Sequence, residues 1–206
     1  MRPIQITTTS FTGADGNGIA VAQQLAAAGD LTLVSSTVTL DPPRFVTFTS
    51  LGNLSGVTFT ITGTAPNGSS QTEALAGPNA NTVTSTLTFA TITAISASAA
   101  VGTDVEAGYT QSGYSVWWPL DIYTPNQVTT ISVNVTGTIN YSVEYTNEDP
   151  FDNSIIQLPK AHPNAALTNG TADQTEFTTT LMRAVRFKVN SGSGTARVTI
   201  TQQSTA

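Results

Sequence analysis

Cysteine is absent from this chain of 206 residues, and histidine occurs once. The absence of cysteine excludes thiol nucleophiles, disulfide bonds and thiolate metal sites together, and it is compatible with an oxidising or a reducing compartment. One histidine without cysteine cannot build the usual zinc sites. We therefore expect no cofactor and no bound metal.

Charge is also scarce. Only 10% of the residues are charged, and seven basic against thirteen acidic side chains give a formal net charge of −6 and a pI near 4.4. A nucleic-acid partner is not expected, because phosphate binding needs a concentrated basic surface. The most basic stretch contains Arg183, Arg186, Lys188 and Arg197. We place the last three on the outer face of a predicted hairpin, as a solubilising sheet face, with a polyanion patch as the weaker alternative.

Long apolar runs and strong helix-forming segments are missing as well. The first ten residues, MRPIQITTTS, contain no apolar signal-peptide core, and no stretch approaches the length of a membrane span. We therefore expect no membrane partner. One short helix is predicted over Gly18 to Gly29, GIAVAQQLAAAG, where apolar and small residues recur at helical spacing and a glycine follows.

The abundant residues are threonine, serine, valine, isoleucine and glycine, which favour strands. Apolar and polar residues alternate strictly in RFVTFTSLGNLSGVTFTIT, Arg44 to Thr62. This period of two predicts a β-hairpin with its loop at Leu51 to Gly56. The same pattern predicts two further hairpins, over Thr129 to Thr146 and Arg183 to Thr201. Apolar parity changes between Phe89 and Ile92, which predicts a bulge or bend there.

These strands predict an all-β fold made of two small antiparallel β-sandwich domains in tandem, of jelly-roll or Ig-like type. Aromatic content rises after the small-residue tract that ends at Gly108. We therefore place the first domain, with a polar amino-terminal arm, at residues 1–108 and the second at residues 109–206. Arg44 and Arg183 are predicted to lie at strand entrances and to pair with acidic or carbonyl groups at a sheet end, or else to contact a neighbouring subunit.

No catalytic motif stands out. A serine hydrolase triad would have to use His162, which lies between two prolines in a chain without a G-x-S-x-G pattern. We interpret it as a solvent-exposed loop histidine. The acidic residues Glu148, Asp149 and Asp152 do not have the spacing of an EF-hand calcium loop, and we interpret them as a solvated strand-exit loop.

Trp117 and Trp118 are the most informative aromatic residues. Adjacent residues on a strand point to opposite faces, so one ring is expected in the core and the other on the surface, suited to a protein partner or a sugar. The alternative is that both are buried, one of them beneath the loop that contains Phe151. We take Trp117, Trp118, Tyr114 and Phe151 as the candidate interface.

Several segments resemble small β-rich virion structural proteins of tailed bacteriophages. They are DGNGIA, AAAGDLTL, LDPPRFVTFTSLGNLSGVTFTITGT, QTEALAGPNANTVTSTLTFATITAISAS, VTGTINYSVEYTNEDPFD and RAVRFKVNSGSGTARVTITQQ. The resemblance covers most of the chain, carries no catalytic signature and transfers no functional residue.

The resemblance implies a non-enzymatic virion protein, of the capsid decoration (cement) type or a head-to-tail accessory, assembled in the bacterial host cytoplasm. Its partners would be other virion proteins, such as the major capsid protein or head-tail proteins, and further copies of itself in a homo-oligomer such as a trimer. The alternative function is a carbohydrate-binding host-attachment module that uses Trp117 or Trp118 as a stacking platform.

Overall fold

The computed structural model describes residues 4–123, 127–150 and 158–204. Within these ranges the regular elements are antiparallel strands, apart from one 3₁₀ turn, η1, over Ala165–Leu167. No helix in the described part of the chain could span a membrane. The all-β class predicted from composition is confirmed.

The chain forms two compact units. Residues 13–113 form one, here called the inserted unit; residues 1–12 and 114–206 together form the other, here called the split unit. This division differs from the predicted one at residue 108. Residues Ile4–Phe11 are not a free arm but strand β1, which pairs with β16 (Gly194–Ser204) at the other end of the chain. Such a long-range pairing leaves no local signal in the sequence.

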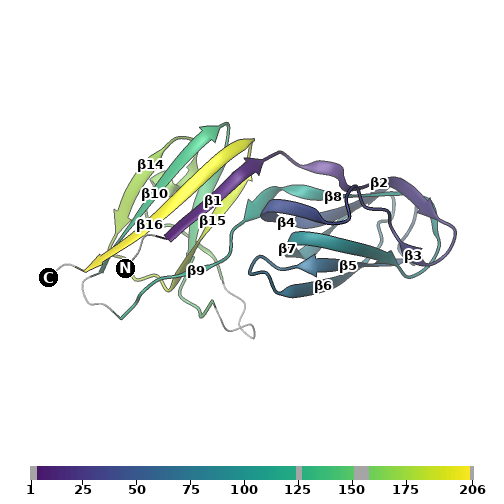
Figure 1. Ribbon diagram of the computed structural model, residues 1–206, viewed down its shortest axis with the longest axis horizontal. Coiled ribbons are helices and arrows are strands. Elements are labelled where there is room, and N and C mark those ends of the chain that lie inside the picture. The colour runs from purple at the N-terminus through teal and green to yellow at the C-terminus, as the bar shows by residue number, and fades with distance from the viewer. Residues whose placement is uncertain (1–3, 124–126, 151–157, 205–206) are drawn as a thin grey trace. The chain divides into compact units, whose positions relative to one another are not determined.

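The inserted unit contains seven strands: β2 (Asp15–Leu25), β3 (Gly29–Asp30), β4 (Val38–Ser50), β5 (Thr58–Thr64), β6 (Ser70–Ala76), β7 (Thr82–Ala97) and β8 (Val101–Tyr114). Their order is β8-β4-β7-β5-β6, with β2 beside β8 and β3 beside β7 (Figure 1). Burial alternates along β4 and β5 as the sequence predicted, with Val46, Phe48, Phe59 and Ile61 inaccessible to solvent. The rings of Phe48 and Phe59 stack with centroids 4.9 Å apart at the centre of this core.

The predicted hairpin between β4 and β5 is wrong, although both strands exist. β7 lies between them and pairs with β4 on one side and with β5 on the other. Along β7 the register with β4 shifts between Phe89 and Thr91, so the predicted irregularity between Phe89 and Ile92 is confirmed, and the register with β5 shifts again between Ile92 and Ala94. Irregularities of this kind bend a strand and increase its local twist.

The predicted helix over Gly18 to Gly29 is also wrong. The segment forms β2, whose pairing with β8 is interrupted by three register shifts, and then β3. The adjacent residues Ile19 and Ala20 are both buried. The Gln23 side chain accepts a hydrogen bond from Thr32 N at 2.8 Å and donates one to Thr32 O at 3.0 Å, in the manner of a neighbouring strand. A helix this short has little stability of its own, and these long-range contacts determine the conformation.

The split unit contains two sheets. In the first, here called the four-stranded sheet, the order is β1-β16-β10-β14, with β10 over Gln127–Gly137 and β14 over Gln174–Thr178 (Figure 1). The second sheet has the order β12-β11-β15, with β12 over Lys160–Ala161, β11 over Asn140–Thr146 and β15 over Ala184–Ser191. Two short strands extend it: β13 (Thr168–Gly170) pairs with β11, and β9 (Trp118–Pro119) pairs with β15. Both sheets contribute side chains to one hydrophobic cluster.

The other two predicted hairpins are wrong for a common reason. β10 and β15 each end at a glycine-containing corner, and the chain then crosses to the other sheet instead of pairing with the strand it has left. The two corners contact each other, because Thr138 N donates a hydrogen bond to Ser193 O at 2.9 Å. Gly192 has φ +100° and Gly194 φ +136°, and the chain at both positions passes close to the opposite corner.

Candidate functional site

A group of polar and aromatic contacts in the described part of the split unit lies on the outer side of β11 and β15. Along β15 the core residues Val185, Phe187 and Val189 alternate with Arg186, Lys188 and Asn190. The antiparallel register places Glu144 opposite Arg186 and Ser142 opposite Lys188. Strand alternation therefore gathers these polar side chains on one face.

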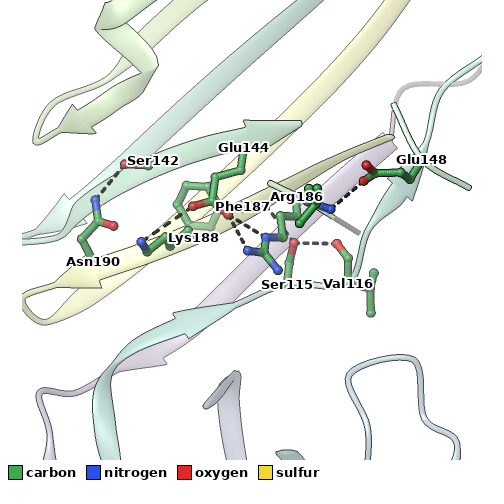
Figure 2. A network of polar contacts seen from close by, with 10 residues as sticks. Ser115, Val116, Ser142, Glu144, Glu148, Arg186, Phe187, Lys188 and Asn190 are labelled. Atoms are coloured by element: carbon green, nitrogen blue, oxygen red, sulfur yellow. Dashed lines mark hydrogen bonds and ion pairs between the residues drawn. The ribbon is translucent and has the colours of Figure 1, made fainter. Parts of the chain in front are cut away.

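Glu144 pairs with both cations of this face. Its Oε2 accepts a hydrogen bond from Arg186 Nε at 2.7 Å and forms an ion pair with Arg186 Nη2 at 2.6 Å, and its Oε1 lies 3.7 Å from Lys188 Nζ (Figure 2). The side chains of Glu144 and Arg186 are only 15% and 19% exposed. A two-donor contact of this kind fixes the guanidinium plane more tightly than a solvated surface pair would.

Two of the candidate interface residues meet at this guanidinium. The Arg186 Cζ lies 4.5 Å from the ring centroid of Tyr114 and 4.5 Å from that of Trp117. Lys188 Nζ lies 5.5 Å from the Tyr114 ring. Desolvated cation–π contacts of this geometry contribute about 1–2 kcal/mol each. We call Tyr114, Trp117, Glu144, Arg186 and Lys188 the aromatic-cation patch.

The remaining two candidate residues are not part of the patch. Trp118 lies on β9 opposite Val185 and packs against the hydrophobic core, where its indole Nε1 is buried without a hydrogen-bond acceptor among the described residues. Trp117 and Trp118 therefore have different surroundings, but Trp117 precedes β9 and both side chains are of intermediate burial, so the predicted division into one core and one surface ring on a shared strand is not what the structure shows. Phe151 lies outside the described residues.

The basic stretch that the sequence suggested is divided between the two sheets. Arg197 is exposed on β16 opposite Asn134, in the four-stranded sheet, while Arg186 and Lys188 are on β15 and are paired with Glu144. The expectation that all three share one outer face is wrong, because β15 and β16 do not form a hairpin.

His162 is not a solvent-exposed loop histidine, contrary to the sequence interpretation. It is 3% exposed, its Nδ1 accepts a hydrogen bond from Asn164 N at 3.1 Å, and its Nε2 is buried without a partner in the described structure. Burial lowers the pKa of His162, against smaller raising contributions from Asn164 and Glu176. Because Nδ1 accepts a hydrogen bond, it carries no proton in the neutral ring, and the ring proton is therefore on Nε2.

The acidic residues that follow β11 are bound individually. Glu148 Oε2 accepts hydrogen bonds from Thr146 Oγ1 and from Leu158 N, both at 2.6 Å, and these bonds lower the pKa of Glu148. Asp149 pairs with Arg183. Asp152 lies outside the described residues. No three potential metal ligands lie together in the ranges that the structure describes.

The two arginines singled out by the hairpin pattern pair as predicted. Arg44 Nη1 donates hydrogen bonds to Gly13 O at 3.1 Å and Thr110 O at 3.4 Å, and Arg183 pairs with Asp149. Arg183 immediately precedes β15, but Arg44 lies in the middle of β4. The predicted partners are confirmed, whereas the predicted strand-entrance position holds only for Arg183.

The sequence interpretation missed a surface feature of the split unit. Two depressions of about 190 and 280 Å³ adjoin, since both are lined by Ile122 and Arg183. We call them together the end groove; its other lining residues are Pro119, Leu120, Tyr123, Asn147, Asp149, Pro150 and Leu181. Tyr123 is 89% exposed and Leu181 63%. The run PLDIY, Pro119 to Tyr123, with large apolar residues outside strict alternation, was the available signal.

Comparisons with known proteins give little further information. No protein-family model matches the chain, and no curated protein sequence matches it. Among solved structures, allantoicase from Saccharomyces cerevisiae aligns over 83% of this chain and 76% of its own, at 7% identity and a TM-score of 0.25. A likeness at that score carries no argument about fold or function.

Proposed function

We propose that this chain is a non-enzymatic structural protein of a tailed-phage virion, most simply a capsid decoration protein, which acts by binding neighbouring proteins. The observation that carries the proposal is the end groove. Large apolar side chains, Tyr123 and Leu181, are exposed around it, and the Arg183–Asp149 pair supplies a polar contact within it. An exposed apolar surface with a polar element is typical of a protein–protein interface.

The aromatic-cation patch supports this function better than a glycan-binding one. A sugar stacks on an open aromatic face, but in the patch the Arg186 guanidinium occupies one face of Trp117 at 4.5 Å. Trp118 packs against the core. The resemblance of the sequence segments to virion proteins points in the same direction as the groove.

We further propose that the split unit is a β-sandwich, one of the two that the sequence pattern suggests. In the split unit, Ile131, Val133, Val198 and Ile200 of the four-stranded sheet belong to the same cluster as Val143, Val185 and Phe187 of the other sheet. A shared core between two sheets is the arrangement expected of a sandwich.

The proposal is tested with purified particles. Mass spectrometry and cryo-electron microscopy of virions should find the protein at symmetric positions, in hundreds of copies for a decoration role or about a dozen for a junction at one vertex. Its absence from the particles would overturn the proposal.

A variant pair then tests the groove. Tyr123→Ser combined with Leu181→Ser should reduce incorporation into particles by at least about tenfold. The matched control is Leu51→Ser, which removes an apolar side chain that is 95% exposed and does not line the groove. Equal incorporation of both variants would remove the groove as the contact surface.

A further inference from the structure

Strand β6 ends the strand order of the inserted unit and leaves one backbone edge unpaired by any described strand. It pairs with β5 along all seven residues, from Ser70 opposite Thr64 to Ala76 opposite Thr58, without a register shift. The other outlying strands of this unit are less regular, since β2 is interrupted by three shifts and β3 has two residues. β6 therefore offers the longest regular open edge in the described part of the inserted unit.

This edge lacks the usual devices that prevent pairing. The sequence SQTEALA contains no lysine, arginine or proline, and Ser70, Thr72, Ala74 and Ala76 are exposed small side chains. Natural proteins commonly protect an edge of this length with charges, prolines or bulges. A regular edge without basic residues or proline is instead suited to the addition of another strand.

The only charged residue of β6 is directed into its own unit. Glu73 Oε1 accepts hydrogen bonds from Thr86 N at 2.7 Å and from Thr86 Oγ1 at 2.8 Å, and Glu73 Oε2 accepts one from Leu87 N at 3.0 Å. These three bonds hold the carboxylate against β7. It therefore does not place a charge at the open edge that would repel an incoming strand.

We propose that β6 is a strand-addition site and that its occupant is β6 of a second copy of this chain, in an antiparallel two-fold pair. Two molecules that each carry a formal charge of −6 repel one another over most of their surfaces. The exposed face of β6 is neutral, so contact there costs the least electrostatic work. In a two-fold pair, the open edge of each copy also forms its backbone hydrogen bonds with the open edge of the other, so the pair is closed.

Side-chain chemistry selects the register. With the two-fold axis at Thr72, this residue lies opposite its own copy, and Gln71 lies opposite Glu73 of the second copy. On the exposed face Ser70 then meets Ala74, while Gln71 and Glu73 keep their hydrogen bonds to β7 of their own unit. An axis at Glu73 would instead place two carboxylates directly opposite each other, which is unfavourable.

The absence of native cysteine makes the register directly testable. In the full chain, Thr72→Cys should form a disulfide-linked dimer under mild oxidation, because residues opposite each other across an antiparallel pair have the required Cβ separation. The control is Thr58→Cys, an exposed position on β5, the strand next to the edge. Cross-linking of Thr72→Cys alone supports the proposal, and equal cross-linking of both variants overturns it.

Sedimentation equilibrium tests the association itself. The weight-average mass of the wild-type chain should rise from 21.4 kDa toward twice that value as its concentration increases. Thr72→Lys places two like charges at the axis and should weaken association about tenfold or more, whereas Thr58→Lys should match wild type. A wild-type protein that stays monomeric up to about 1 mM, or a Thr72→Lys variant that associates normally, would overturn the proposal. These measurements do not depend on the virion assignment.

Discussion

Arg44 is a charged residue held inside the inserted unit. It is 2% exposed, its Cζ lies 4.6 Å from the ring centroid of Tyr109, and its Nη1 donates to two backbone carbonyls. Burial lowers the pKa of this guanidinium, and the nearby Tyr109 and Asp41 oppose that shift. Arg44, the first residue of the alternating motif, therefore connects β4 with β8 and with the segment before β2 from inside the unit.

Removal of Arg44 should destabilise the protein. Arg44→Ala leaves the Gly13 and Thr110 carbonyls without this donor and deletes the contact with Tyr109, so we expect a loss of about 2–4 kcal/mol. Urea unfolding at pH 7 measures the change. Arg197→Ala, at an exposed position, is the control and should stay within about 0.5 kcal/mol of wild type. Equal stability of the two variants would show that the Arg44 contacts contribute nothing.

His162 should make stability depend on pH. Burial lowers its folded-state pKa below the usual 6.5, so the unfolded chain takes up a proton first as the pH falls. The contribution of His162 to stability is therefore complete above about pH 6.5 and decreases as the pH falls toward the folded-state pKa. Protonation would also place two donors, Nδ1–H and Asn164 N–H, against each other.

The measurement is the free energy of unfolding in urea between pH 7.5 and pH 5.5. Because His162 is the only histidine, a variant without it isolates the effect. His162→Gln should show a flatter profile across this window than wild type. If the unfolding free energies of wild type and His162→Gln changed in parallel with pH, His162 would not be the source of the pH dependence.

At the scale of elements, the split unit depends on how the chain passes from sheet to sheet. The corner after β10 and the corner after β15 contact each other through Thr138 and Ser193. A Cβ atom at Gly192 would lie 2.0 Å from Thr138 O, and one at Gly194 would lie 2.0 Å from Thr136 O. The two corners therefore fit together only because glycine occupies these positions.

Alanine at either corner should destabilise the fold. Gly192→Ala and Gly194→Ala combine positive φ with a collision against backbone, and each should cost about 2–4 kcal/mol or more. Thermal unfolding measures the loss. Gly102→Ala is the control, since nothing lies within 4 Å of its added Cβ and its φ is not positive. Similar melting temperatures for the three variants would show that the corners accommodate a side chain.

At the scale of the whole molecule, each unit has its own core. The core of the inserted unit is assembled from residues 19 to 107. The core of the split unit includes Phe11, which is 1% exposed, together with residues from Leu120 to Ile200. The split unit is therefore complete only when the first strand of the chain is added to its second half.

Dissection of the chain should reflect this division. Residues 13–113 should fold as an isolated fragment, whereas residues 114–206 alone lack β1 and Phe11. Loss of a buried phenylalanine side chain alone costs about 3–5 kcal/mol, so this second fragment should be markedly less stable.

A permuted fragment provides the matched comparison. Appending residues 1–12 after residue 206 allows β1 to return along β16 as an antiparallel neighbour, in the register that pairs Ile4 with Ile200. Circular dichroism and urea unfolding should show cooperative folding of the permuted fragment. Equal stability of the fragments with and without residues 1–12 would contradict the division.

The sequence by itself determined the all-β class and the buried faces of strands such as β4 and β5. Alternation along β4 and β5 depends only on local spacing, because successive residues of a strand point to opposite sides. The partners of Arg44 and Arg183 were also foreseen in kind, since buried or paired guanidinium groups seek carbonyl and carboxylate oxygens. The meeting of Tyr114 and Trp117 at Arg186 could not be foreseen in detail.

Only the tertiary structure decided which strands are neighbours. In all three motifs that the sequence presented as hairpins, the two strands do not pair with each other. β7 lies between β4 and β5, and in each of the other two motifs one strand belongs to each sheet of the split unit. The pairing of β1 with β16 and the burial of His162 are non-local in the same way. Alternation fixes which face of a strand is buried, but its backbone hydrogen bonds are equally suited to many partners, and the choice depends on packing of the whole core.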